Sequence, residues 1–302
     1  MAVSTRVIKR RIKSVANTRK ITKAMELVAA SKMRKSVNLT QASRAYSRVL
    51  QQMVAHIRQT VPERSHRLLS ASAKASASLV IVAASDRGLC GGFNAQLLKK
   101  AIEFLSSREG EKIEVVTVGR RAELAVKRAG YPIVASFEAI SNAPSFERSA
   151  PVGEFAFQAF IEKRVDRVFM VYTDFKSALA QVPTAMQLLP IIPETDLKED
   201  PELKEEDDVA QQVPIDAPDI LFEPSPQDVL VSILPRLLET EVYQSLLESS
   251  ASEHSSRMMA MRSATDNATD MLQDLTFTFN QARQASITRE ISEISAGKAA
   301  IE

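Results

Sequence analysis

The chain has 302 residues, of which 45% are hydrophobic and 25% charged, and its formal net charge is +2. This composition is typical of a globular protein and excludes collagen-like, disulfide-stabilised and wholly disordered chains. The single cysteine, Cys90, cannot form an internal disulfide, and the N-terminus lacks an apolar signal core, so we expect a reducing, cytoplasm-facing compartment. The longest uncharged stretch, 177–193, contains three prolines, and we therefore expect no membrane-spanning segment.

Glycine and proline are distributed unevenly along the chain. All 13 prolines lie within 62–235, and all eight glycines lie within 88–297. Because glycine and proline disfavour a helix interior by about 1 and 3 kcal/mol, residues 1–61 and 236–296 can each form one long helix. A helix of about 55 residues is about 80 Å long, so both ends of the chain are predicted to be rods.

The first predicted rod is basic and has a heptad pattern. Residues 1–35 contain eleven lysines and arginines and one acidic residue, Glu26. Apolar residues that step by three and four predict the seam of a coiled coil. The predicted seam residues are Ile21, Met25, Val28, Leu39, Ala42, Tyr46, Val49 and Met53.

The second predicted rod repeats this pattern and should pair with the first. Because a folded middle section must return the chain, the two rods are expected to form an antiparallel coiled coil. The second rod is longer, so its C-terminal end, with Ile291 and Ile294, should extend alone by about 20 Å and need a partner for its apolar surface. The predicted seam residues are Leu230, Leu234, Leu237, Met261, Ala264, Ala268, Met271 and Leu275.

Strand and helix patterns alternate in the middle of the chain, which predicts a small Rossmann-like α/β domain with a mainly parallel sheet. The fold class is therefore a long antiparallel coiled coil of N- and C-terminal helices plus this central domain. Extended segments are expected at 79–85, 113–118, 131–137, 167–172 and 178–189, and helices near 97–105, 120–129 and 151–164. The expected divisions are the N-terminal helix 1–61, the α/β domain 76–192, an acidic, proline-containing linker and foot segment 193–226, and the C-terminal helix 227–302.

Two motifs leave other functions open. Gly88, Cys90 and Gly92 form G-x-C-x-G between a strand and a helix, as in the nucleophile turn of a cysteine hydrolase. Such a thiolate needs a histidine base, and none of the histidines, at 56, 66 and 254, follows a strand of the α/β domain.

The basic first rod could alternatively bind nucleic acid, but few aromatic residues interleave its charges, and an acidic protein surface is the better partner. We expect no cofactor, because the turn lacks a nucleotide-binding fingerprint, and no metal, because no ligand cluster has suitable spacing.

Three sequence runs resemble the gamma subunit of the rotary ATP synthase. They are IKRRIKSVANTRKITKAMELVAASKMRK at 8–35, SDRGLCGGFN at 85–94, and SSRMMAMRSATDNATDMLQDLTFTFNQARQASITREISEI at 255–294. The resemblance implies a non-catalytic central rotor stalk that transmits torque between the membrane c-ring and the catalytic alpha/beta ring, so that ion flow is coupled to ATP synthesis. It also implies a peripheral location on the cytoplasmic side of an energy-transducing membrane, such as a bacterial plasma membrane.

The resemblance also assigns partner contacts by position. The segment 219–226 resembles the foot that meets the epsilon subunit and the c-ring, with Phe222 and Glu223 as contacts; Phe222 stands where many relatives have tyrosine. The shaft and tip are implied to touch the alpha and beta subunits. Residues that match shaft contacts to the catalytic beta subunits are Met25, Arg257, Arg283, Gln284, Thr288 and Glu290.

Overall fold

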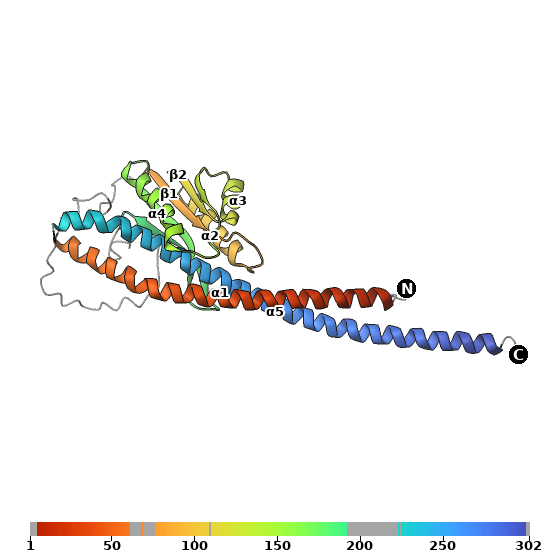
Figure 1. Ribbon diagram of the computed structural model, residues 1–302. Coiled ribbons are helices and arrows are strands. Elements are labelled where there is room, and N and C mark those ends of the chain that lie inside the picture. Colours follow the sequence, from red (N-terminus) through yellow and green to blue (C-terminus); the bar gives the residue numbers. More distant parts are fainter. Residues whose placement is uncertain are drawn as a thin grey trace. The chain divides into compact units, whose positions relative to one another are not determined.

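The computed structural model describes residues 5–60, 68, 76–108, 110–191, 223 and 225–299 (Figure 1). Along the chain, the α/β section lies between two very long helices. The elements are α1 Thr5–Thr60, β1 Ala77–Ala83, α2 Phe93–Ser106, β2 Lys112–Val118, α3 Arg120–Ala129, β3 Ile133–Phe137, α4 Phe146–Ile161, β4 Arg167–Phe175, β5 Gln181–Leu189 and α5 Pro226–Ala299.

The chain divides into two compact units. The terminal unit comprises Met1–Ser31 with Arg257–Glu302, and the central unit comprises Lys32–Ser256. Each long helix contributes one part to each unit, because α1 and α5 continue without interruption through the division. Pro235 lies inside α5 without ending it.

The central unit contains a five-stranded sheet in the order β3-β2-β1-β4-β5. β1 pairs in parallel with β2 and β4, and β2 pairs in parallel with β3, as expected for strands joined by helices. β5 instead pairs antiparallel with β4, because a short turn at Ser177–Ala180 connects the two strands directly. The sheet is therefore mixed, with a predominantly parallel core and one antiparallel edge strand.

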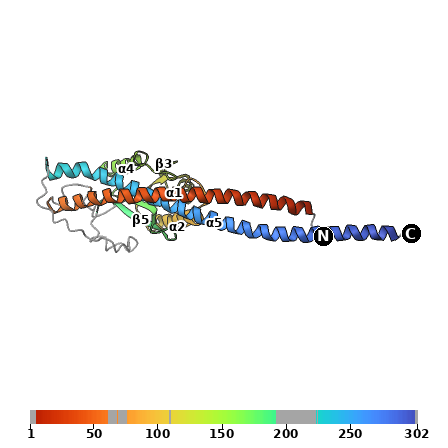
Figure 2. The same ribbon diagram turned by 60° about the horizontal axis from the view of Figure 1, so that its bottom comes forward.

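Apolar side chains cover both faces of this sheet. On one face, Phe93 and Leu97 of α2 and Val126 of α3 form a buried cluster with strand residues such as Val80. On the other face, α4 and the central-unit parts of α1 and α5 pack together. There α1 and α5 lie side by side in both views (Figures 1 and 2). A sheet that is covered on both faces explains why β1 is buried at every position.

The heptad period predicted for α1 is confirmed, but its phase is wrong by about one residue. The predicted seam residues Ile21, Val28, Leu39, Tyr46, Val49 and Met53 are exposed, as is Ala42, and Met25 is half-buried. The buried stripe consists of Ile8, Thr22, Ala29, Ser36, Thr40, Ser47, Leu50, Val54 and Ile57. Small hydroxyl residues can occupy a seam because their hydroxyls find partners there; Thr40 Oγ1, for example, donates to Ser36 O at 2.9 Å.

The seam predicted for α5 is mostly confirmed. Leu230, Leu234 and Leu237 are buried in the central unit, and Met261 and Ala268 are buried in the terminal unit. Ala264 and Leu275 are half-buried. Met271 is exposed, so its assignment to the seam was wrong.

Within the terminal unit, one hydrogen bond fixes how the two helices pair. Thr265 Oγ1 of α5 donates to Thr22 Oγ1 of α1 at 2.8 Å. Because the helices are antiparallel, the first helical residue, Thr5, then falls opposite Ala282. Every residue from Arg283 to Gly297 is exposed, as this register requires. The last part of α5, about 25 Å long, therefore extends past the start of α1.

Candidate functional site: a buried polar collar and an exposed helix end

The middle of α5 is buried on all sides although most of its residues are polar. All twelve residues of Gln244–Ser255 are buried, and nine of them are polar. We call this segment the polar collar. A helix enclosed on every side is normally apolar, since a buried polar group without a partner is costly. The collar must therefore be stabilised by specific partners in the surrounding elements.

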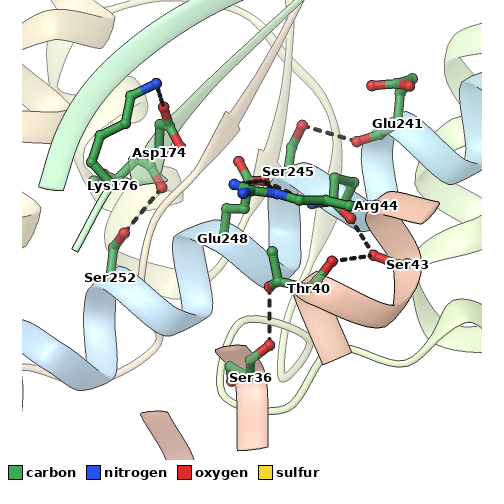
Figure 3. A network of polar contacts seen from close by, with 12 residues as sticks. Ser36, Thr40, Ser43, Arg44, Asp174, Lys176, Glu241, Ser245, Glu248 and Ser252 are labelled. Atoms are coloured by element: carbon green, nitrogen blue, oxygen red, sulfur yellow. Dashed lines mark hydrogen bonds and ion pairs between the residues drawn. The ribbon is translucent and has the colours of Figure 1, made fainter. Parts of the chain in front are cut away.

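The first set of partners comes from α1 (Figure 3). Nη2 of Arg44 donates to Oε1 of Glu248 at 3.0 Å, and Ser36 Oγ lies 3.3 Å from Ser250 Oγ. One turn away, Ser43 donates its hydroxyl to Gln244 Oε1. The polar stripe of α1 and the collar thus form a hydrogen-bonded seam between the two helices.

The second set of partners comes from the sheet side. Three serine hydroxyls of the collar donate to backbone carbonyl oxygens: Ser249 to Ala83 at 3.4 Å, Ser252 to Thr173 at 3.2 Å and Ser255 to Ala178 at 2.8 Å. These carbonyls lie at the end of β1, in β4 and in the turn before β5. Next to the collar, Ser256 Oγ donates to Gln181 Oε1 at 3.0 Å.

His254 completes this contact with the α/β section. Its Nε2 lies 3.1 Å from the backbone oxygen of Asn142, and Asn142 Oδ1 accepts a hydrogen bond of 2.9 Å from Lys32 Nζ of α1. Of the two positions that the sequence leaves open for His254, a helix surface or a helix seam, the structure shows a buried seam position. The sequence carries a signal for this burial in the run SSASEHSS at 249–256, where seven of eight residues are polar in a helix that is expected to pack against another.

Glu248 is a buried acid of the collar with a perturbed pKa. Burial raises the pKa of its carboxyl to about 7. The hydrogen bond from Gln244 opposes this rise, the nearby carboxylate of Asp174 adds to it, and the charge of Arg44 again opposes it. Asp174 is itself buried and pairs with Lys176 at 2.9 Å. The collar thus holds a carboxyl group that can gain or lose a proton near neutral pH.

The exposed end of α5 carries most of the predicted shaft contacts. Arg283, Gln284, Thr288 and Glu290 are all exposed. At about 100° per residue, they lie with three exposed isoleucines within about 160° of the helix circumference. The isoleucines, Ile287, Ile291 and Ile294, form a central stripe, and the four polar residues flank it on both sides. Such a face is typical of a binding surface rather than of a solvated helix.

The remaining predicted contacts are not brought together with this end. Met25 and Arg257 are half-buried within the terminal unit. Both belong to the paired part of the two helices and not to residues 283–297, which extend past the start of α1. In the predicted foot, Glu223 is exposed. Phe222 and the predicted linker lie outside the described residues, apart from Glu223, Ser225 and the start of α5.

The glycine turn around Cys90 has a structural explanation. Cys90 is buried, and Nδ2 of Asn94 lies 3.1 Å from its Sγ. The preceding Asp86 accepts hydrogen bonds from the backbone amides of Arg120 and Ala139 and from Ser141 Oγ, so this turn joins the loops after three strands. Of the three histidines in the sequence, His254 lies in the collar, and the side chains of residues 56 and 66 lie outside the described part of the chain.

Within the described residues, no group of three or more His, Cys, Asp or Glu side chains is arranged to hold a metal ion. The same part of the chain contains no helix that is both long and apolar enough to cross a bilayer.

Comparison with known proteins identifies the family. The ATP synthase family model matches residues 4–301. The chain belongs to the ATP synthase gamma chain family. The gamma chain of Chloroflexus aurantiacus is 38% identical over 302 residues, which cover 99% of each chain, and that of Alkaliphilus metalliredigens is 37% identical over 303 residues, which cover all of both.

Solved structures agree with this membership. A chain of the central stalk and c-ring structure of the Tetrahymena thermophila mitochondrial ATP synthase is 25% identical, with a TM-score of 0.57 over 81% of this chain and 99% of its own. A chain from the rotor of the Euglena gracilis enzyme is 18% identical, with a TM-score of 0.59, and shares the fold. As a gamma chain, the protein is the central rotor stalk and a non-catalytic subunit of ATP synthase, which excludes the cysteine hydrolase and nucleic-acid-binding alternatives as its function.

Proposed function

We propose that the chain transmits torque between a membrane c-ring and a catalytic ring of alpha and beta subunits, so that ion flow is coupled to ATP synthesis. The observation that carries this proposal is the free end of α5. Residues 283–297 extend beyond the register of α1 and expose a stripe of three isoleucines. An apolar stripe of this kind needs a partner, and a ring of subunits can provide a socket for it.

The polar residues beside the stripe are proposed to contact the catalytic beta subunits. Arg283 and Glu290 lie along one edge of the stripe, and Gln284 and Thr288 lie along the other. These side chains can form charge-assisted and neutral hydrogen bonds that differ as the helix turns. Met25 and Arg257, which are half-buried in the terminal unit, are proposed to make further contacts with the same subunits.

Asymmetry then explains how turning changes chemistry elsewhere. One helix end cannot present the same face to three equivalent catalytic subunits, so each angular position favours a different conformation in each of them. Moving a two-state site from 1:99 to 99:1 takes about 5.5 kcal/mol. Hydrogen bonds to charged groups contribute about 1.5–3 kcal/mol each, so a few such contacts with steric exclusion can supply this bias.

The segment 219–226 is proposed to meet the epsilon subunit and the c-ring, with Phe222 and the exposed Glu223 as contacts. The proposed location is therefore that of a peripheral membrane protein on the cytoplasmic side of an energy-transducing membrane. Bacterial relatives that match over their full length support a bacterial plasma membrane.

Deletion of residues 283–302 tests the proposal in the assembled complex. ATP hydrolysis and ATP-driven ion pumping are measured together in membrane vesicles, with Ser292→Ala as the control, because Ser292 lies on the side of the helix away from the isoleucine stripe. We expect the deletion to lower pumping far more than hydrolysis and the control to change neither. Unchanged pumping by the deletion variant would reject the assignment of the α5 end.

A further inference from the structure

The polar collar joins three parts of the central unit that must move together if the chain is a rotor. α5 supplies the collar, α1 supplies its first set of partners, and the sheet supplies the second. We propose that the collar is the joint that couples rotation of the α/β domain to rotation of the two helices. This inference rests on the proposed function, because it assigns the route of torque within that rotor.

The apolar part of α5 next to the collar shows why a special joint is needed. Between Leu230 and Val242, buried leucines of α5 pack into the apolar cluster beneath the sheet. Apolar burial stabilises this packing without a preferred direction. Such contacts hold the helix close to the sheet. They resist rotation of the helix about its own axis only through the steric fit of the side chains.

The collar differs because its contacts are directional. Hydrogen bonds weaken steeply when their angle departs from linear, so a rotation of α5 about its axis disturbs all of them at once. The hydroxyls of Ser249, Ser252 and Ser255 reach three different segments at the end of the sheet. A turn of α5 relative to the sheet would leave these buried groups without partners, which is the costly state for any polar atom in a protein interior.

Glu248 provides the corresponding contact to α1. Its side chain is 8% exposed, whereas that of Arg44 is 51% exposed, so the pair has one buried and one solvated member. Gln244 Nε2 donates to the same carboxylate oxygen at 2.7 Å, which holds the acid in one orientation. If α1 slipped along α5, the carboxylate would stay buried but lose its cation.

The test uses the assembled ATP synthase and two attachment points for a probe. The chain has one cysteine, which is buried, so a cysteine introduced at an exposed residue can be labelled selectively within this chain, in a complex whose other subunits lack accessible cysteines. Glu162→Cys, at the end of α4, reports on the α/β domain, and Ser232→Cys reports on α5. The angular spread of each probe is recorded at the pauses of ATP-driven rotation, with and without Ser252→Ala together with Ser255→Ala.

We expect the double variant to broaden the angular spread of the domain probe several-fold while the α5 probe keeps its spread. The matched control is Thr278→Val, which removes an exposed hydroxyl that donates to the backbone oxygen of Asp274 within α5. Equal spread of the domain probe with and without the double variant would overturn the inference. If the double variant does not assemble, Glu248→Gln, which preserves the shape of the side chain, is measured instead. The probe is then attached to α1 through Leu39→Cys. An unchanged angular spread of this probe would also overturn the inference.

Failure of the proposed function gives a different result. In that case, neither probe rotates while ATP is hydrolysed, even in the complex without collar substitutions. Rotation of both probes with no effect of the collar variants rejects the joint alone.

Discussion

Arg44 and Glu248 are 204 positions apart in the chain, yet Nη2 of Arg44 lies 3.0 Å from Oε1 of Glu248. The pair joins the two long helices at the point where α5 is enclosed on all sides. The carboxylate is buried and the guanidinium is half-exposed. Breaking this ion pair should therefore cost more free energy than breaking a surface pair and less than breaking a fully buried one.

Arg44→Met should destabilise the chain by about 1–3 kcal/mol, because the buried carboxylate of Glu248 loses its cation while the apolar stem remains. The measurement is urea unfolding followed by circular dichroism at pH 8. The control is Lys99→Met, since Lys99 pairs with Glu103 at 3.7 Å and both side chains are exposed. The control should stay within about 0.5 kcal/mol of the parent chain. Equal effects of the two substitutions would contradict the account of the pair.

Stability should also depend on pH through Glu248. Its pKa is about 7 in the folded chain and 4.5 as the ordinary value, so between these values the folded state binds more protons than the unfolded state. The contribution of this group is therefore fully present below 4.5 and is lost as the pH rises through about 7.

The measurement is the unfolding free energy of the parent chain and of Glu248→Gln across this range. The unfolding free energy of the parent chain should fall as the pH rises, and it should fall less in Glu248→Gln. The difference should be about 1.4 kcal/mol for each unit by which the pKa of Glu248 differs between the folded and unfolded states. Glu154→Gln, at an exposed position of α4, should leave the profile unchanged. Superimposable profiles for the parent and Glu248→Gln would show that this carboxyl titrates normally.

Two glycines predict a contrast in backbone tolerance. Gly119 has a φ of 90°, and a Cβ built there would lie 2.2 Å from the backbone oxygen of Ala84. Gly130 has a φ of 83° but open space around it. Gly130→Ala should cost about 1 kcal/mol from backbone strain alone, whereas Gly119→Ala must also displace the backbone of Ala84, just after β1, and should cost more than about 3 kcal/mol. Similar unfolding midpoints for the two variants would refute this distinction.

The isoleucine stripe predicts a variant that affects function without affecting stability. Ile291→Asp lies on the exposed end of α5, so the unfolding free energy should change by less than about 0.5 kcal/mol. In the assembled complex, the same substitution should lower ATP-driven ion pumping per ATP hydrolysed. Ala285→Asp, on the opposite face of the same exposed segment, should change neither quantity. Loss of pumping by both variants would show that the face is not specific.

Several elements could be predicted from the sequence because their signals are local. The helix expected at 120–129 is α3 with the same bounds, since Gly119 and Gly130 flank it and both adopt a positive φ. The two long helices follow from the absence of breakers at the chain ends. The overhang of α5 follows from their difference in length, and the pair Thr22 and Thr265 fixes its extent.

The buried surfaces were harder to predict because their partners are distant in sequence. Ranking residues by apolarity placed Leu39 and Tyr46 in the seam of α1, whereas the structure buries Ser36 and Thr40. Hydroxyl residues become suitable for a seam only when acceptors face them. The acceptors of the collar are largely backbone oxygens of the sheet, such as that of Thr173, and no residue type in the sequence marks them.

The most direct test of the account is rotation of this chain inside an immobilised ATP synthase. A bead is attached through Ser232→Cys, and the alpha and beta subunits are fixed to a surface. On addition of ATP, we expect the bead to turn in one direction and to pause at three equivalent angles. A bead that stays still while the same complexes hydrolyse ATP would contradict the assignment of this chain as the rotor.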